Sequence, residues 1–109
     1  MADKQIKKAK GIQLAEVVSY QKGSIVSREI VNNKAGTVTA FSFDKGQGLS
    51  EHVAPFDALV YILDGAAKIL ICGKAHFLKK GEMIIMPANK PHALEAERKF
   101  KMLLVMIRP

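Results

Sequence analysis

The chain has 109 residues, of which 49% are hydrophobic and 25% charged, and its formal net charge at pH 7 is +7. A chain of this length forms one domain around one core. It has no apolar run near the roughly 20 residues that a membrane-spanning helix needs, and its single Cys72 excludes an internal disulfide. We therefore expect a soluble protein with no membrane partner, located in the cytoplasm.

The positive charge is concentrated at the start of the chain. Residues 1–10 hold four Lys and one Asp, a net charge of +3, which leaves +4 on the remaining 99 residues. No recognition-helix pattern, zinc-finger spacing or aromatic RNA-binding stripe accompanies this charge, so we expect no nucleic-acid partner. We interpret residues 1–11 as a basic flexible tail. Residues 12–22 are expected to form an edge strand or a short turn packed onto the domain or onto a partner.

From residue 23 onward the sequence predicts short strands and almost no helix. Eight candidate strands are separated by Gly, Pro, Asn and Asp, which favour turns; they span 24–32, 36–44, 58–65, 66–73, 74–81, 82–87, 91–97 and 99–107. Many short strands at regular spacing are typical of a sandwich or barrel. Residues 12–109 are therefore predicted to form a single all-β domain.

Three of these strands are apolar on both faces. In 36–44, 58–65 and 99–107, neither alternating set of side chains is convincingly polar. One face of a barrel strand lines the interior, so apolar side chains on the other face must meet a second sheet or a second subunit. We therefore expect a homodimer.

Glycine, proline and histidine residues between positions 46 and 96 follow a characteristic spacing. Gly46 is followed by five residues and His52, and this first motif ends at Gly65; the second motif runs from Gly81 through Pro87 to His92. Both resemble the two motifs of the cupin superfamily. The resemblance implies a small single-domain, RmlC-like cupin of the conserved-barrel type, with a double-stranded β-helix or jelly-roll fold. Asn89 stands where that pattern has Gly, and Asn tolerates the left-handed backbone conformation.

The sequence departs from the family pattern at the metal ligands. The resemblance implies three His and one Glu as ligands, but Ala54 stands at the second His and Ala58, or Leu59 with the longer spacer, at the Glu. Ala96 likewise stands at the Asn of the second motif. His52 and His92 remain, so we expect at most a weakly bound divalent metal such as Zn, Ni, Fe or Mn. Asp57 could add a third ligand if a bulge turned it inward, although strict alternation points it away.

The resemblance also implies that His52 and His92 converge inside one end of the barrel. Two imidazoles supply a proton donor and a proton acceptor near neutral pH, so both are candidate catalytic acid/base residues. We predict an apolar substrate pocket around them, framed by Ala54, Ala58, Met86, Met102 and Leu104.

Three functions are consistent with such a site. The first is a cupin that binds a small organic molecule and acts, if it is an enzyme, on a sugar-derived acid or carbonyl compound through the two histidines. The second is a metal-dependent isomerase or dioxygenase with Asp57 as an extra ligand. The third is a ligand sensor or interaction module without turnover. The substrate classes rest on analogy with related cupins.

Overall fold

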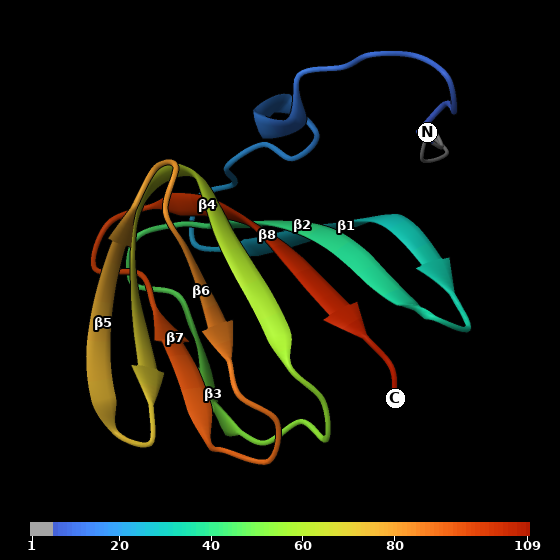
Figure 1. The fold of residues 1–109 in the computed structure, drawn as a ribbon. Helices are drawn as coiled ribbons and strands as arrows, with labels where there is room; N and C mark the ends of the chain where they lie inside the picture. The colour runs from blue at the N-terminus through green and yellow to red at the C-terminus, as the bar shows by residue number, and fades with distance from the viewer. Residues whose placement is uncertain (1–5) are drawn as a thin grey trace.

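The computed structural model describes residues 6–109, and nearly all of its regular structure is β-strand (Figure 1). One short 3-10 helix, η1, spans Leu14–Glu16. The strands are β1 (Ile25–Asn33), β2 (Gly36–Phe43), β3 (Gly48–His52), β4 (Ala58–Ile71), β5 (Lys74–Lys79), β6 (Met83–Met86), β7 (His92–Glu95) and β8 (Phe100–Ile107). The predicted all-β class is confirmed. No helix among residues 6–109 is long and apolar enough to cross a membrane.

The strands form one curled antiparallel sheet in which β4 joins two halves. The hydrogen-bonded order is β1-β2-β8-β4-β7-β3, and β5 and β6 also pair with β4. The first half of β4 pairs with β8 and β6, and its second half pairs with β5 and β7. Figure 1 shows β4 rising to the top of the molecule and descending on the other side. The two halves therefore face each other across a shared interior.

The strand β4 corrects the prediction of two separate strands at 58–65 and 66–73. The sequence pattern indicates a turn at Asp64-Gly65, but this pair lies where β4 bends, next to a register shift between Ile62 and Asp64. Gly65 has a φ of +74°, and a Cβ on it would lie 2.2 Å from the carbonyl oxygen of Lys99. Only glycine fits this bend without strain. A second correction is that residues 48–52 form a strand, β3, which the predicted set omits.

A continuous apolar core fills the interior. It includes Val60, Ile62, Ile69 and the stacked rings of Phe43 and Phe100, whose centroids are 4.5 Å apart. All five side chains are fully buried. This part of the core lies near Gly65, because Phe100 pairs with both Gly65 and Phe43. We call this the Gly65 end of the barrel.

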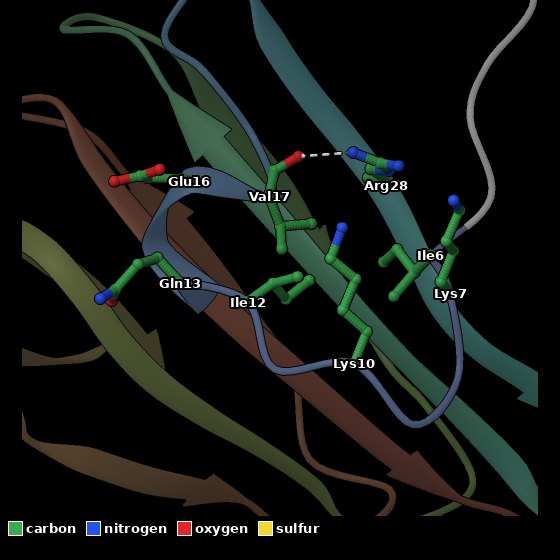
Figure 2. A pocket seen from close by; sticks show the side chains of 8 residues that line it. All are labelled: Ile6, Lys7, Lys10, Ile12, Gln13, Glu16, Val17 and Arg28. Atoms are coloured by element: carbon green, nitrogen blue, oxygen red, sulfur yellow. Dashed lines mark hydrogen bonds between the residues drawn. The ribbon is translucent and has the colours of Figure 1, made fainter.

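The segment before β1 packs on the outside of the sheet. Val17 and Val18 cover Ala40 of β2, which is fully buried, and Ile6 packs against the same cluster. Residues 12–22 therefore pack onto the barrel, with η1 in place of an edge strand (Figure 2). Residues 1–5 of the predicted tail lie outside the described residues, and the flexibility of residues 1–11 stays a prediction.

Candidate functional site

His52 and His92 come from neighbouring strands at the end of the barrel opposite Gly65. His52 is the last residue of β3, His92 is the first residue of β7, and the two pair across the sheet. His92 also pairs with Ile71, the last residue of β4. The chain thus brings together two side chains that are forty positions apart. We call this the histidine end of the barrel.

A β-bulge turns His52 toward its partner. Leu49 pairs with Leu94 and His52 pairs with His92, so three steps along β3 match two steps along β7. Without the extra residue, alternation would place the side chain of residue 51, rather than that of His52, on the same face of the strand as Leu49. The bulge therefore decides that the imidazole, and not the carboxylate of Glu51, meets His92.

The two imidazoles contact each other directly. The two Nε2 atoms are 3.0 Å apart, and the rings meet edge to face with centroids 4.3 Å apart. Nδ1 of His52 lies 2.8 Å from the carbonyl oxygen of Ser50, and Nδ1 of His92 lies 3.2 Å from that of Lys90. The predicted convergence of the two rings thus ends in one direct hydrogen bond between their Nε2 atoms.

Counting hydrogens assigns roles to the ring nitrogens. A carbonyl oxygen only accepts, so each Nδ1 contact needs an N–H on the ring, and the Nε2 contact needs one more. A neutral pair carries two such hydrogens. We assign these two hydrogens to the two shorter contacts. Nδ1–H of His52 then donates to the Ser50 carbonyl, and Nε2–H of His92 donates to Nε2 of His52, which is the acceptor. A third hydrogen, on the singly charged pair, also completes the longest contact, between His92 and Lys90.

The two rings differ in their access to solvent. His92 is 3% exposed, whereas His52 is an exposed residue. Burial lowers the pKa of His92 below its ordinary value, and the positive charge of a protonated His52 lowers it further, against a smaller opposing effect of the bond to Lys90. The ring of His92 is therefore predominantly neutral at pH 7.

Two loops hold this end of the barrel. Oδ1 of Asp57 accepts a hydrogen bond of 2.8 Å from the backbone N–H of Ala88, and the N–H of Asn89 donates to the carbonyl of Ala54 at 2.7 Å. Asn89 has a φ of +64°, the left-handed conformation in which Asn can take the place of Gly. Asp57 thus connects residues 53–57 to residues 87–91, the loop that leads into His92.

The alanines at the family's ligand positions supply no replacement for a metal ligand. Ala58 and Ala96 are 2% and 3% exposed, and both belong to the apolar core. Residues 6–109 contain no group of three or more His, Cys, Asp and Glu side chains arranged to hold a metal ion. Two imidazole nitrogens and no third protein ligand do not fit a firmly held metal, so we derive no chemical step through one.

The predicted pocket residues separate into two groups. Ala58, Met86 and Met102 are 1–3% exposed and belong to the core, with Leu104 packed against them, whereas Ala54 is half-buried in the loop after β3. Access to the histidines is therefore from the side of His52 and Ala54.

Nothing in the sequence identifies the hydrogen-bond partners of the two Nδ1 atoms at residues 50 and 90, because each contributes a backbone carbonyl that any residue carries.

Comparison with known proteins gives both a family and a set of structural relatives. The model of the cupin domain family matches residues 40–108. No curated protein matches the chain. A conserved protein of unknown function from Streptococcus pyogenes is similar over 97% of this chain and 93% of its own, with 40% identity and a TM-score of 0.92.

Two further solved structures agree with this match. A cupin 2 conserved barrel domain protein from Leptotrichia buccalis shares 50% identity over 89% of this chain, with a TM-score of 0.87; the match spans 47% of that longer protein. A cupin superfamily protein from Desulfitobacterium hafniense DCB-2 shares 25% identity over 97% of each chain, with a TM-score of 0.90. These matches confirm the jelly-roll barrel that the two motifs predicted.

Proposed function

We propose, because the chain belongs to the cupin family, that it binds a small organic molecule bearing a hydroxyl group at the histidine end of the barrel. The observation that carries this proposal is the 3.0 Å contact between Nε2 of His52 and Nε2 of His92. When both rings are neutral, Nε2 of one ring carries a hydrogen to donate and Nε2 of the other accepts, and the two atoms lie side by side. A hydroxyl group both donates and accepts, so it can replace this contact with one bond to each ring.

Access favours exchange of the ligand at this site. The exposed His52 lies at the end of β3, next to the loop 53–57, so a ligand can reach its ring from solvent. His92 is held by burial and by its position between β3 and β4. The buried ring then donates a hydrogen bond to the ligand oxygen, and the exposed ring accepts one from the ligand hydroxyl. A donor and an acceptor on adjacent rings support the proposal of general acid–base chemistry on a sugar-derived acid or carbonyl compound.

Binding of sugar acids tests the proposal. Isothermal titration with gluconate and galacturonate should show a Kd that rises about tenfold or more in His92→Gln, because one hydrogen bond to a buried group is lost. His76→Gln is the matched control, since His76 lies on β5 away from the pair. Equal affinities for wild type and His92→Gln would contradict the proposal. Product formation would separate an enzyme from a sensor that binds without turnover.

Metal analysis addresses the second function, a metal-dependent isomerase or dioxygenase. Asp57 is already bonded to the N–H of Ala88, which argues against its use as a ligand. Protein purified without chelator should contain far less than one equivalent of Zn, Ni, Fe or Mn. A near-stoichiometric metal that is lost in both His52→Ala and Asp57→Asn would instead support the metal enzyme.

The outer face of the sheet supports assembly into a homodimer. One row of apolar side chains crosses five neighbouring strands in register, with every member opposite the next: Val31, Val38, Val105, Leu59 and Ile85. Two of them, Val31 and Ile85, are 46% and 51% exposed. The neighbouring Tyr61 and Met83 pair on the same face and are also exposed. A contiguous apolar surface of this kind suits an isologous contact with a second copy.

Light scattering coupled to size exclusion tests this assembly. The wild type should elute at twice the chain mass of 12.0 kDa, and Ile85→Lys should shift the species toward the monomer. Phe77→Lys is a matched control, because Phe77 is 68% exposed but lies on β5, outside this row. A monomeric wild type would contradict the dimer.

We also propose that the protein works in the cytoplasm. Cys72 is exposed and unpaired, and a reducing compartment keeps such a thiol free. Fractionation of cells that produce the chain, followed by detection in the soluble cytoplasmic fraction, tests this location; recovery outside the cell would contradict it.

A further inference from the structure

The loop of residues 87–91 leads into the buried imidazole and is joined to the loop before β4 by two hydrogen bonds. Oδ1 of Asp57 accepts a bond of 2.8 Å from the N–H of Ala88, and the N–H of Asn89 donates to the carbonyl of Ala54 at 2.7 Å. Ala88 and Asn89 are consecutive, so the two loops are joined at neighbouring peptide groups. Of the two bonds, only the one to Asp57 uses a side chain, and a substitution can therefore remove it.

The far end of this loop is also attached to the sheet. The carbonyl of Pro91 accepts a bond of 2.9 Å from the N–H of Cys72, the residue after β4. The ring of Pro87, like that of Pro91, restricts the backbone φ angle to about −65°. The N–H of Lys90 closes the turn on the carbonyl of Pro87 at 3.4 Å. The Lys90 carbonyl therefore lies between two attached points, and bonds that neither histidine makes set its position.

The Lys90 carbonyl competes with His52 for the single hydrogen of a neutral His92 ring. Nδ1 of His92 lies 3.2 Å from this carbonyl, and its Nε2 lies 3.0 Å from Nε2 of His52. A neutral imidazole carries a hydrogen on only one of its two nitrogens, and the bonds that the nitrogens make decide which one. A hydrogen on Nδ1 would leave two bare Nε2 atoms facing each other. It would also remove the donor that the proposed ligand needs.

The length of the contact to Lys90 favours the tautomer with its hydrogen on Nε2. The distance of 3.2 Å is at the long end of the range for an N–H···O bond, whose most common length is about 2.9 Å. A carbonyl that was free to move could approach Nδ1 and would then stabilise the other tautomer. Bonds that hold residues 87–91 at the observed distance therefore keep the donor on the side of His52.

We propose that Asp57 is a positioning residue of the histidine site: its bond to Ala88 keeps the Lys90 carbonyl away from Nδ1 of His92, so that the hydrogen of the neutral ring stays on Nε2. Asp57 acts through the loop, and no contact between its carboxylate and a ligand is required. The effect on a ligand rests on the proposed function, whereas the effect on the tautomer does not. The bond that argues against Asp57 as a metal ligand thus gives this residue another role at the site.

The tautomer of His92 tests this role. Long-range proton–nitrogen correlation spectra of the labelled full chain, at about pH 7.5 where a neutral imidazole dominates, should show mainly Nε2–H in the wild type. In Asp57→Ala the ratio of Nδ1–H to Nε2–H should rise about threefold or more, as loss of one hydrogen bond predicts. Asp57→Asn keeps an oxygen acceptor and should keep a ratio near that of the wild type. An unchanged ratio in Asp57→Ala, or a neutral wild-type ring with its hydrogen on Nδ1, would overturn the proposal.

A matched control separates this role from a general loss of stability. Oε1 of Glu82 accepts a bond of the same length, 2.8 Å, from the N–H of Lys79, where β5 turns toward β6. Glu82→Ala therefore removes the same kind of bond away from the two loops and should leave the tautomer ratio of His92 unchanged. An equal rise of the ratio in Glu82→Ala and Asp57→Ala would overturn the proposal.

Titration with gluconate connects the tautomer to the ligand. The Kd should rise in Asp57→Ala by at least the factor by which the Nε2–H fraction of His92 falls, because only that tautomer can donate to the ligand. An unchanged Kd beside a lower Nε2–H fraction would overturn the proposed role at the site. A wild type that binds neither gluconate nor galacturonate would contradict the proposed function instead, and the tautomer ratio would still decide the role of Asp57.

Discussion

The two ends of the barrel hold two ring pairs at nearly equal distances but with opposite chemistry. At the Gly65 end, the stacked Phe43 and Phe100 rings are 4.5 Å apart and fully buried. At the histidine end, the centroids of His52 and His92 are 4.3 Å apart, and one ring is exposed. The first pair stabilises the fold by removing apolar surface from water. The second pair places a buried polar ring beside an exposed one, and the proposed function uses this contact to bind a ligand.

The sharpest test of this contrast removes one ring from each end. Phe100→Ala should lower the free energy of unfolding by about 3–5 kcal/mol, because it leaves a cavity in a fully buried stack. His92→Ala should cost only about 1 kcal/mol, since the ring's hydrogen bonds are partly replaced by water. Urea denaturation followed by circular dichroism measures both. Equal losses would show that the two ends contribute alike to the core.

The bend in β4 gives the next largest effect. Gly65→Ala should destabilise the fold by at least about 1–2 kcal/mol from the left-handed conformation alone, with the contact to the Lys99 carbonyl adding to it. Gly11→Ala is the matched control, because no heavy atom lies within 4 Å of the added Cβ. Thermal unfolding should separate the two variants clearly. A Gly65→Ala protein as stable as Gly11→Ala would mean that β4 does not need this bend.

Asp57 allows a smaller test at the histidine end. Asp57→Ala removes the acceptor for the N–H of Ala88 and should cost about 0.5–1.5 kcal/mol. Asp57→Asn keeps an oxygen acceptor and should cost less. Amide hydrogen exchange at Ala88 should rise in the alanine variant. Unchanged exchange there would show that the carboxylate does not hold this loop.

The smallest effect is a dependence of stability on pH. Burial lowers the pKa of His92 in the folded chain below its ordinary value of 6.5, so between the two values the unfolded chain binds more protons. The contribution of the neutral ring is complete above about pH 6.5 and declines as the pH falls below it. Urea midpoints between about pH 7.5 and 5.5 should therefore fall in the wild type and change less in His92→Gln. If the urea midpoint changed equally with pH in the wild type and in His92→Gln, His92 would not be the cause of the pH dependence.

The spacing of turn residues indicated a sandwich or barrel, and the resemblance to the two cupin motifs implied the jelly roll and the meeting of the two histidines. It did not predict that β4 is continuous, since a glycine at a bend and a glycine at a turn have the same local sequence. It also could not predict the bulge before His52, which depends on pairing with β7 and not on the residues of β3 alone.

The proposed chemistry depends most on how the two rings hold their protons. Long-range proton–nitrogen correlation spectra of labelled protein, recorded at about pH 7.5 where the neutral ring of His92 dominates, report the tautomer of each imidazole. We predict a protonated Nδ1 on His52, bonded to the Ser50 carbonyl, with its Nε2 free to accept from the Nε2–H of His92. A His52 ring with its proton on Nε2 and a bare Nδ1 would contradict the paired site and the ligand chemistry derived from it.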